Sequence, residues 1–195
     1  MEIKTIFSGP CDNNTYLICD DKNAILIDTS CSVDKINTEL NGRKLQAVFI
    51  THGHYDHIAN LDEIVEEFGV KVYLTKQCFD KLNNKKTNCS DVFDMEYETR
   101  LTSSDFVFVK TDDSLDFIKD YPITVYITEG HTDCGVCLKL GKDILFSGDT
   151  IFYRSYGRTD LPTGSSQKLR ESLKFINETF KNFTIYPGHG RKFVL

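Results

Sequence analysis

Apolar positions recur in two periods along this chain and divide it into strands and helices. Alternating or continuous apolar runs predict strands at residues 2–7, 16–19, 24–27, 45–50, 70–74, 106–109, 122–127, 135–140, 143–147 and 183–186. Polar turn residues at 20–23 and 141–142 predict hairpins, and Gly9 with Pro10 predicts a turn after the first strand.

Helical spacing appears in three places. Ser32 is a candidate N-cap for a short helix that Asn41 and Gly42 end. A second helix is expected to begin close to Asp56 and to end at Gly69, because apolar residues recur there at helical intervals. Ser165 is expected to cap a long helix whose apolar face consists of Leu169, Leu173, Ile176 and Phe180. Residues 75–105 give the weakest signal, with a short helix at 76–82 followed by a polar loop.

The strands fall into an N-terminal and a C-terminal set, and helix follows each set. An apolar sheet must cover both of its faces, so we expect two sheets packed face to face with helices outside. The sequence therefore predicts an α/β fold, an αββα sandwich of two mixed β-sheets with helices on the outer faces. One domain is expected to span residues 1–195.

Composition narrows the classes of partner. The net charge of −6 does not favour a nucleic-acid backbone as a partner. No apolar run approaches the length needed to span a bilayer, so we expect no membrane partner, and the first residues do not resemble a signal peptide. Seven cysteines are an odd number, which favours reduced thiols in the cytoplasm over a disulfide framework. The oligomeric state is left open.

The histidines carry the candidate chemistry. Three of the five, His52, His54 and His57, lie within six residues, and His131 and His189 each follow a glycine in a turn. Every one of them comes after a β-rich run, where strand ends can gather side chains at one rim. Imidazole and carboxylate together suit zinc, iron or manganese.

Two ion sites can be drawn from these residues. His52, His54 and His131 would form one site, and Asp56, His57 and His189 would form a second. Asp149 would bridge the two, because a carboxylate has two oxygens. Two divalent ions that share a water would lower its pKa toward neutrality.

Four motifs in this order resemble a metallo-β-lactamase-fold hydrolase: residues 51–57, 130–132, 147–150 and 187–190. The segment 157–162 resembles the short, single-domain relatives of glyoxalase II, also called hydroxyacylglutathione hydrolase. The aspartate at position 149 also resembles that branch, because true β-lactamases have a cysteine at this position. The resemblance implies the αββα fold and a dinuclear metal hydrolase, with zinc the first choice of metal.

The resemblance also implies a reaction. A metal-bridging hydroxide would attack the carbonyl of a small-molecule thioester such as an S-2-hydroxyacylglutathione, and Asp56 would hold both a metal and this water. Glyoxalase II binds glutathione partly through a C-terminal helical domain, and only six residues follow His189 here. Tyr153, Arg154 and Arg158 are therefore the expected substrate-binding residues, since arginine suits carboxylates. Arg158 is equally suited to a structural ion pair with Asp160. Arg191 and Lys192 are alternative substrate-binding residues, although solvated surface charges are the favoured interpretation of both.

Two other functions fit the same motifs. Persulfide dioxygenases share them, use one iron and consume oxygen; a complete second ligand group favours hydrolysis. A non-catalytic metal-binding regulatory protein is the other alternative. Cys134 and Cys137 have the C-x-x-C spacing, but Cys137 falls in a strand, so we expect no metal or redox pair there, although Cys134 is expected near the site and sensitive to oxidation.

Overall fold

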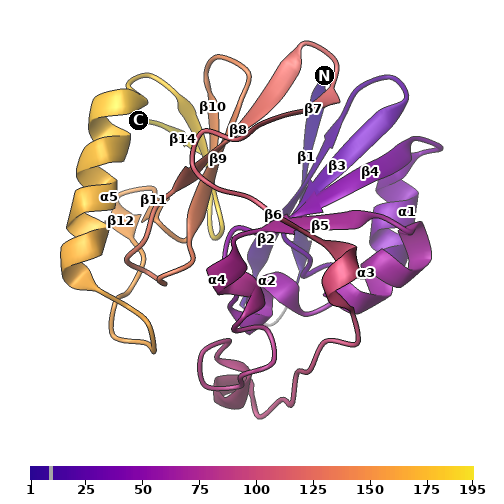
Figure 1. Cartoon of the computed structure of the whole chain (residues 1–195). Helices are drawn as coiled ribbons and strands as arrows, with labels where there is room; N and C mark the ends of the chain where they lie inside the picture. The colour runs from indigo at the N-terminus through magenta and orange to yellow at the C-terminus, as the bar shows by residue number, and fades with distance from the viewer. Residues whose placement is uncertain (9–10) are drawn as a thin grey trace.

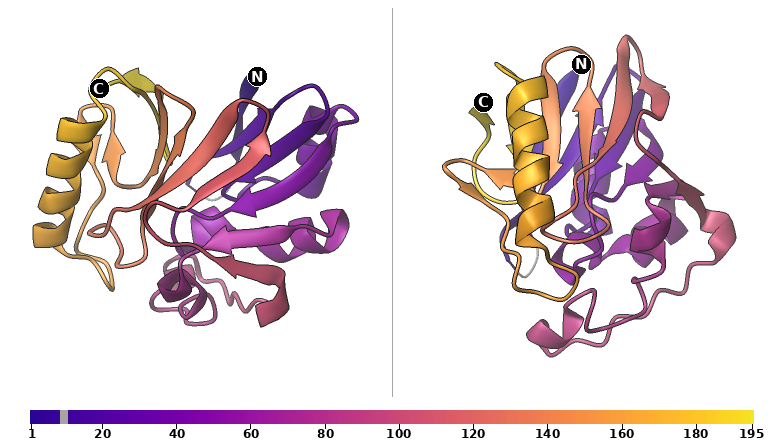
Figure 2. Two further views of the ribbon diagram at one scale, coloured as in Figure 1. Left: turned by 45° about the horizontal axis from the view of Figure 1, so that its top comes forward. Right: turned by 60° about the vertical axis from the view of Figure 1, so that its left-hand side comes forward.

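The computed structural model describes residues 1–8 and 11–195 as two β-sheets packed face to face between outer helices (Figure 1). The expected turn at Gly9 and Pro10 lies outside the described residues. The N-terminal half of the chain builds one sheet and the C-terminal half builds the other, and the left view in Figure 2 shows them as separate layers. The predicted αββα sandwich is confirmed.

The first sheet has the strand order β1-β2-β3-β4-β5-β6. Its strands are β1 (Glu2–Ser8), β2 (Asn13–Cys19), β3 (Asn23–Ile27), β4 (Lys44–Phe49), β5 (Lys71–Leu74) and β6 (Phe106–Phe108). The pairs β1–β2 and β2–β3 are antiparallel, and the pairs from β3 to β6 are parallel. The apolar runs of β3 and β4 are nearly continuous because both faces of this sheet are covered.

The second sheet has the order β14-β13-β10-β9-β8-β7. Its strands are β7 (Ser114–Ile118), β8 (Tyr121–Ile127), β9 (Val136–Leu140), β10 (Ile144–Gly148), β13 (Thr184–Pro187) and β14 (Phe193–Val194). Only β10 and β13 pair in parallel, so this sheet is also mixed. A small hairpin of β11 (Ile151–Phe152) and β12 (Ser155–Tyr156) follows β10.

Helices cover the outer face of each sheet. They are α1 (Val33–Leu40), α2 (Tyr55–Ile58), α3 (Leu61–Phe68), α4 (Lys76–Phe79) and α5 (Ser166–Thr179). Helices α1 and α3 pack on the first sheet and α5 packs on the second, each over a cluster of buried apolar side chains. A third apolar cluster, which includes Tyr16, Phe49 and Phe146, lies between the two sheets. Among the described residues, no helix is both long enough and apolar enough to cross a membrane.

The structure corrects several predicted elements. The single helix expected from Asp56 to Gly69 is wrong: it is two helices, α2 and α3, separated near Asn60. The backbone N–H of Asn60 donates to the carbonyl of Thr29 at 2.9 Å, which takes the chain out of the helical ladder at that point. Strands β11, β12 and β14 were not predicted, because each has only two residues. Strand β7 was also missed, although its exposed and less exposed residues alternate.

Residues 75–105 contain α4 and two short 3-10 helices, η1 (Ser90–Phe93) and η2 (Ser103–Asp105). The buried carboxylate of Asp62 on α3 organises the end of this segment. It accepts hydrogen bonds from the Thr99 hydroxyl at 2.6 Å and from the Arg100 backbone N–H at 2.7 Å. One distant acid thus fixes a loop that has little periodicity of its own.

Two serines at helix starts give a matched test of capping. The Ser165 side chain accepts a hydrogen bond from the Lys168 backbone N–H at α5, as predicted, whereas Ser32 occupies the cap position of α1 without any side-chain cap bond. We expect Ser165→Ala to lower the free energy of unfolding by about 0.5–1 kcal/mol and Ser32→Ala to change it by less than half as much. Urea denaturation measures both; equal losses would contradict the assignment of the two caps.

Candidate metal centre

Five segments bring chemistry-bearing side chains to one rim of the sandwich. The loop after β4 carries His52 and His54, and the adjoining helix α2 carries Asp56 and His57. From the second sheet come His131 after β8, Asp149 after β10 and His189 after β13. Each sheet therefore supplies part of the site, and only their face-to-face packing completes it.

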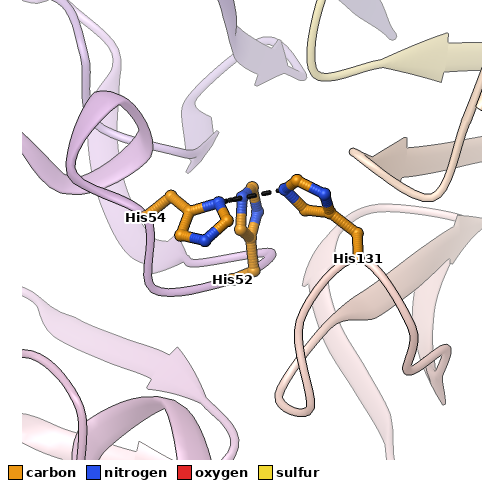
Figure 3. A group of neighbouring side chains, drawn as sticks. All are labelled: His52, His54 and His131. Carbon is orange, nitrogen blue, oxygen red and sulfur yellow. Dashed lines mark hydrogen bonds between the residues drawn. The ribbon is translucent and has the colours of Figure 1, made fainter. Parts of the chain in front are cut away.

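The first ligand group consists of His52, His54 and His131. His54 Nδ1 lies 3.1 Å from His52 Nε2 and 2.9 Å from His131 Nε2. Figure 3 shows the three rings converging, with His52 and His54 on one loop and His131 reaching them from the other sheet. All three residues are buried, so their ring nitrogens face protein atoms and not bulk solvent.

The second group consists of Asp56, His57 and His189. His189 Nε2 lies 3.3 Å from Asp56 Oδ2 and 3.4 Å from His57 Nε2. Asp149 stands between the two groups. Its Oδ1 is 3.4 Å from His57 Nε2, and its Oδ2 is 3.5 Å from His131 Nε2 and 3.4 Å from His189 Nε2. All seven predicted metal ligands are thus brought together in space.

Hydrogen bonds fix the outer nitrogen of four imidazoles. His57 Nδ1 pairs with the Asp28 carboxylate at 2.7 Å, and His52 Nδ1 lies 3.2 Å from the Thr51 hydroxyl. His131 Nδ1 donates to the Arg158 carbonyl at 2.8 Å, and His189 Nδ1 donates to the Cys11 carbonyl at 3.1 Å. In each case Nε2 is left facing the centre, which is how metal-binding histidines are usually oriented.

The sequence reasoning missed the role of Asp28. This residue is 1% exposed and has a left-handed backbone with φ of 59°. Its carboxylate also accepts from the Thr51 backbone N–H at 2.8 Å, so it joins the ends of β3 and β4 behind the histidine cluster. The signal was present: an acid that directly follows the apolar run 24–27 is rarely buried without a partner.

The donor set fits a bound cation. Asp149 Oδ1 is buried and has no hydrogen-bond partner, although it faces the site. Burial, reinforced by the nearby His131 imidazole, lowers the pKa of His54 to about 3, and burial likewise depresses the pKa of His52. Neutral imidazoles and an unpartnered carboxylate oxygen are the ligand atoms that zinc, iron or manganese accept.

Glycines admit this close packing at two points. A Cβ on Gly188 would lie 2.1 Å from Asp149 Oδ1, so no side chain fits beside that carboxylate. Gly148, with φ of 48°, would place a Cβ 2.8 Å from the Thr51 side chain. Gly53, between His52 and His54, does not have a positive φ; an added Cβ there would lie 3.3 Å from Cys78 Sγ.

The expected substrate-binding residues lie in or after the β11–β12 hairpin. The guanidinium group of Arg154 is 5.2 Å from the Tyr153 ring centroid, and that of Arg191 is 3.9 Å from it. Arg158 forms a bidentate ion pair with Asp160, at 2.6 and 2.7 Å. The structure therefore contains the ion pair that was the alternative for Arg158. Arg158 contacts the site through its backbone carbonyl, which accepts a hydrogen bond from His131.

Cys134 and Cys137 occupy different settings. Cys137 lies inside β9 and is buried, as predicted from its place in a strand pattern. Cys134 is also buried, three residues after His131, and its thiol lies 3.5 Å from the Thr132 hydroxyl. Its predicted sensitivity to oxidation stays a prediction.

Residues 8–189 match the family described as the metallo-beta-lactamase superfamily, and the chain belongs to it. It is 28% identical over 192 residues to the probable polyketide biosynthesis zinc-dependent hydrolase PksB of Bacillus subtilis (strain 168), covering 96% of this chain and 76% of that protein. It is 27% identical over 194 residues to a hydroxyacylglutathione hydrolase of Tolumonas auensis (strain DSM 9187 / NBRC 110442 / TA 4), covering 97% of this chain and 65% of that protein.

Solved structures agree with this placement. The B3 metallo-beta-lactamase BLEG-1 superposes with a TM-score of 0.91 at 28% identity, covering 99% of this chain and 94% of that one. TTHA1623, solved in a di-iron-bound form, gives 0.83 at 25% identity, covering 98% and 94%. Family and ligand groups together define the chain as a metal-dependent hydrolase of this superfamily.

Metal uptake should be linked to proton release. Burial disfavours a charged His189, but hydrogen bonds to the Asp149 and Asp56 carboxylates outweigh it and raise its pKa to about 9 from 6.5. The metal-free imidazole is therefore protonated at about pH 7.5 and must lose its proton to bind a cation. We expect affinity for the ion at this group to rise as the pH increases toward about 9, because His189 loses its proton over that range.

Calorimetric titration of metal-free protein in buffers of different ionisation enthalpy measures this release. At about pH 7.5 the observed heat should depend on the buffer and correspond to about one proton or more per protein. A heat independent of the buffer would contradict the protonated state of His189.

Proposed function

We propose that this chain is a dinuclear metal hydrolase that cleaves thioesters of small molecules, with S-2-hydroxyacylglutathione the first substrate class to test. The observation that carries the proposal is the pair of adjacent ligand groups with one carboxylate, Asp149, in reach of both. Two divalent cations, zinc first and iron or manganese next, would supply an activated water and an electrophile for the carbonyl oxygen.

Asp56 is the proposed catalytic residue. Burial opposes its charge, but His57 and His189 outweigh that effect and lower the pKa of the Asp56 carboxyl, which keeps it ionised. Its Oδ2 faces the interior of the site at 3.3 Å from His189 Nε2. Its backbone carbonyl accepts hydrogen bonds from the Asn13 amide and the Ser30 hydroxyl, which hold this residue in place. Its ionised carboxylate would then hold a metal ion and accept a hydrogen bond from the attacking water, which orients that water toward the carbonyl carbon.

A basic surface beside His189 is the proposed seat of the anionic part of a substrate. Arg154 and Arg191 lie against Tyr153, and both guanidinium groups can bind a carboxylate through two parallel hydrogen bonds. Arg158 is already paired with Asp160, so its contribution to binding is proposed to be the smaller one. The hydroxyacylglutathione hydrolase among the relatives supports a thioester as the substrate. Glutathione also carries free carboxylates, which the two arginines could bind.

A reducing compartment fits the cysteines. All seven are free thiols, including Cys78, Cys134 and Cys137 in the interior. We propose a cytoplasmic location on this basis, because buried thiols persist where disulfides are kept reduced. Neither nucleic acid nor a membrane is proposed as a partner.

Elemental analysis of the purified protein, combined with a panel of thioesters and a β-lactam, tests the proposal. We expect two equivalents of a divalent metal and turnover of at least one thioester. Asp56→Ala should lower kcat about 10²-fold or more through loss of the carboxylate that orients the attacking water. Asp116→Asn, which changes an exposed acid on β7, is the matched control and should leave kcat within twofold.

Two results would overturn this function. One equivalent of iron with persulfide-dependent oxygen uptake and no thioester cleavage would assign the chain to the dioxygenases. Full retention of thioesterase activity in Asp56→Ala would remove Asp56 from the mechanism, and no turnover of any ester or lactam by fully loaded protein would favour a regulatory role.

A further inference from the structure

The start of β2 reaches from the first sheet across to the loop that carries His189. Asn14 donates its backbone N–H to the Gly188 carbonyl at 2.7 Å. Its side-chain amide donates to the Pro187 carbonyl at 2.8 Å and to the Gly190 carbonyl at 2.9 Å. The Tyr16 hydroxyl adds a second donor to the Pro187 carbonyl, at 2.6 Å.

These contacts are buried and directional. Asn14 is 1% exposed and Tyr16 is 3% exposed, so water does not replace their hydrogen bonds. Asn14 Oδ1 has no partner, which is consistent with an amide oriented by two carbonyls that can only accept. Burial raises the pKa of the Tyr16 hydroxyl far above its usual range, so this group stays a donor.

The loop 187–190 has few other ties to the first sheet. β13 ends at Pro187, and Gly188 donates its N–H to the Gly148 carbonyl at 2.8 Å within the second sheet. His189 itself is held by the Cys11 carbonyl at 3.1 Å and by a β-bridge to Asn13. Asn14 therefore brackets the histidine, since it binds the carbonyls on both sides of it.

The first ligand group is joined across the sheets by different bonds. The Val136 backbone N–H donates to the Thr51 carbonyl at 2.9 Å, and the Thr75 hydroxyl donates to the Cys134 carbonyl at 3.2 Å. These bonds lie next to His52 and His131 and do not involve β2. The two groups are thus positioned by separate contacts between the sheets.

From this separation we propose that Asn14, assisted by Tyr16, is a positioning residue for His189 that sets the metal affinity of the Asp56–His57–His189 group without setting that of the His52–His54–His131 group. The proposal rests on the two-ion centre of the proposed function. Asn14→Ala keeps the backbone bond to Gly188 but leaves the Gly190 carbonyl without its amide donor and Pro187 with only Tyr16. The loop can then relax and move Nε2 of His189 away from Asp56 and Asp149.

Zinc titration of metal-free protein against a chromophoric chelator gives the two dissociation constants separately. We expect Asn14→Ala to weaken the second constant about 10–100-fold, the usual effect of removing an outer partner of a ligand, and to leave the first within threefold. Tyr16→Phe should act in the same direction with a smaller change. Because Tyr16→Phe keeps the ring that packs on Phe146 and Tyr186, it serves if Asn14→Ala does not fold.

Asn88→Ala is the matched control. Asn88 is also a fully buried asparagine whose side chain holds a loop, through the Leu82 carbonyl at 2.7 Å. Its bond to the Tyr55 backbone N–H uses the main-chain carbonyl, which alanine keeps. It should lower stability without separating the two constants. The role of Asn14 is overturned, while the proposed function stands, if the two dissociation constants shift equally in Asn14→Ala and in Tyr16→Phe, or if the second dissociation constant is unchanged. A wild-type protein that holds only one zinc ion overturns the two-ion centre and this role together.

Discussion

The candidate metal centre is governed by one electrostatic constraint: five imidazoles and two carboxylates face one another in a largely buried space. His54 Nδ1 has two imidazole nitrogens within 3.1 Å, and Asp149 faces three histidines. Lone pairs at such distances repel unless a proton or a cation lies between them. Burial disfavours the charged forms of His57 and His189, but the neighbouring carboxylates outweigh it and raise the pKa of both, which favours a proton in part of this role before a cation binds.

The packing of the two sheets holds these donors together. The second sheet supplies His131, Asp149 and His189, and the first sheet supplies the rest. Between them lies an apolar layer in which Tyr16 packs on Phe146 and Tyr186, with ring centroids 5.1 and 5.5 Å apart. This layer reaches the rim of the site, so the geometry of the centre follows from the packing of the core.

The sequence predicted the fold, and it predicted which residues gather at the site, because their signals are local. Apolar periodicity located most of the strands, and each candidate ligand follows a strand end or turn. Contacts between distant residues could not be read in this way. The break at Asn60 depends on Thr29, and residues 97–100 depend on Asp62. The roles of Asp28 and Asn14 were missed for the same reason: each acts through a partner that only the folded chain brings close.

Anomalous diffraction from crystals of metal-loaded protein, recorded at the absorption edge of the bound metal, tests the central claim most directly. The account predicts two peaks: one within bonding distance of His52, His54 and His131, and one bonded to Asp56, His57 and His189, with Asp149 touching both. A single peak with His189 turned away from Asp56, or no peak among these side chains, would contradict it.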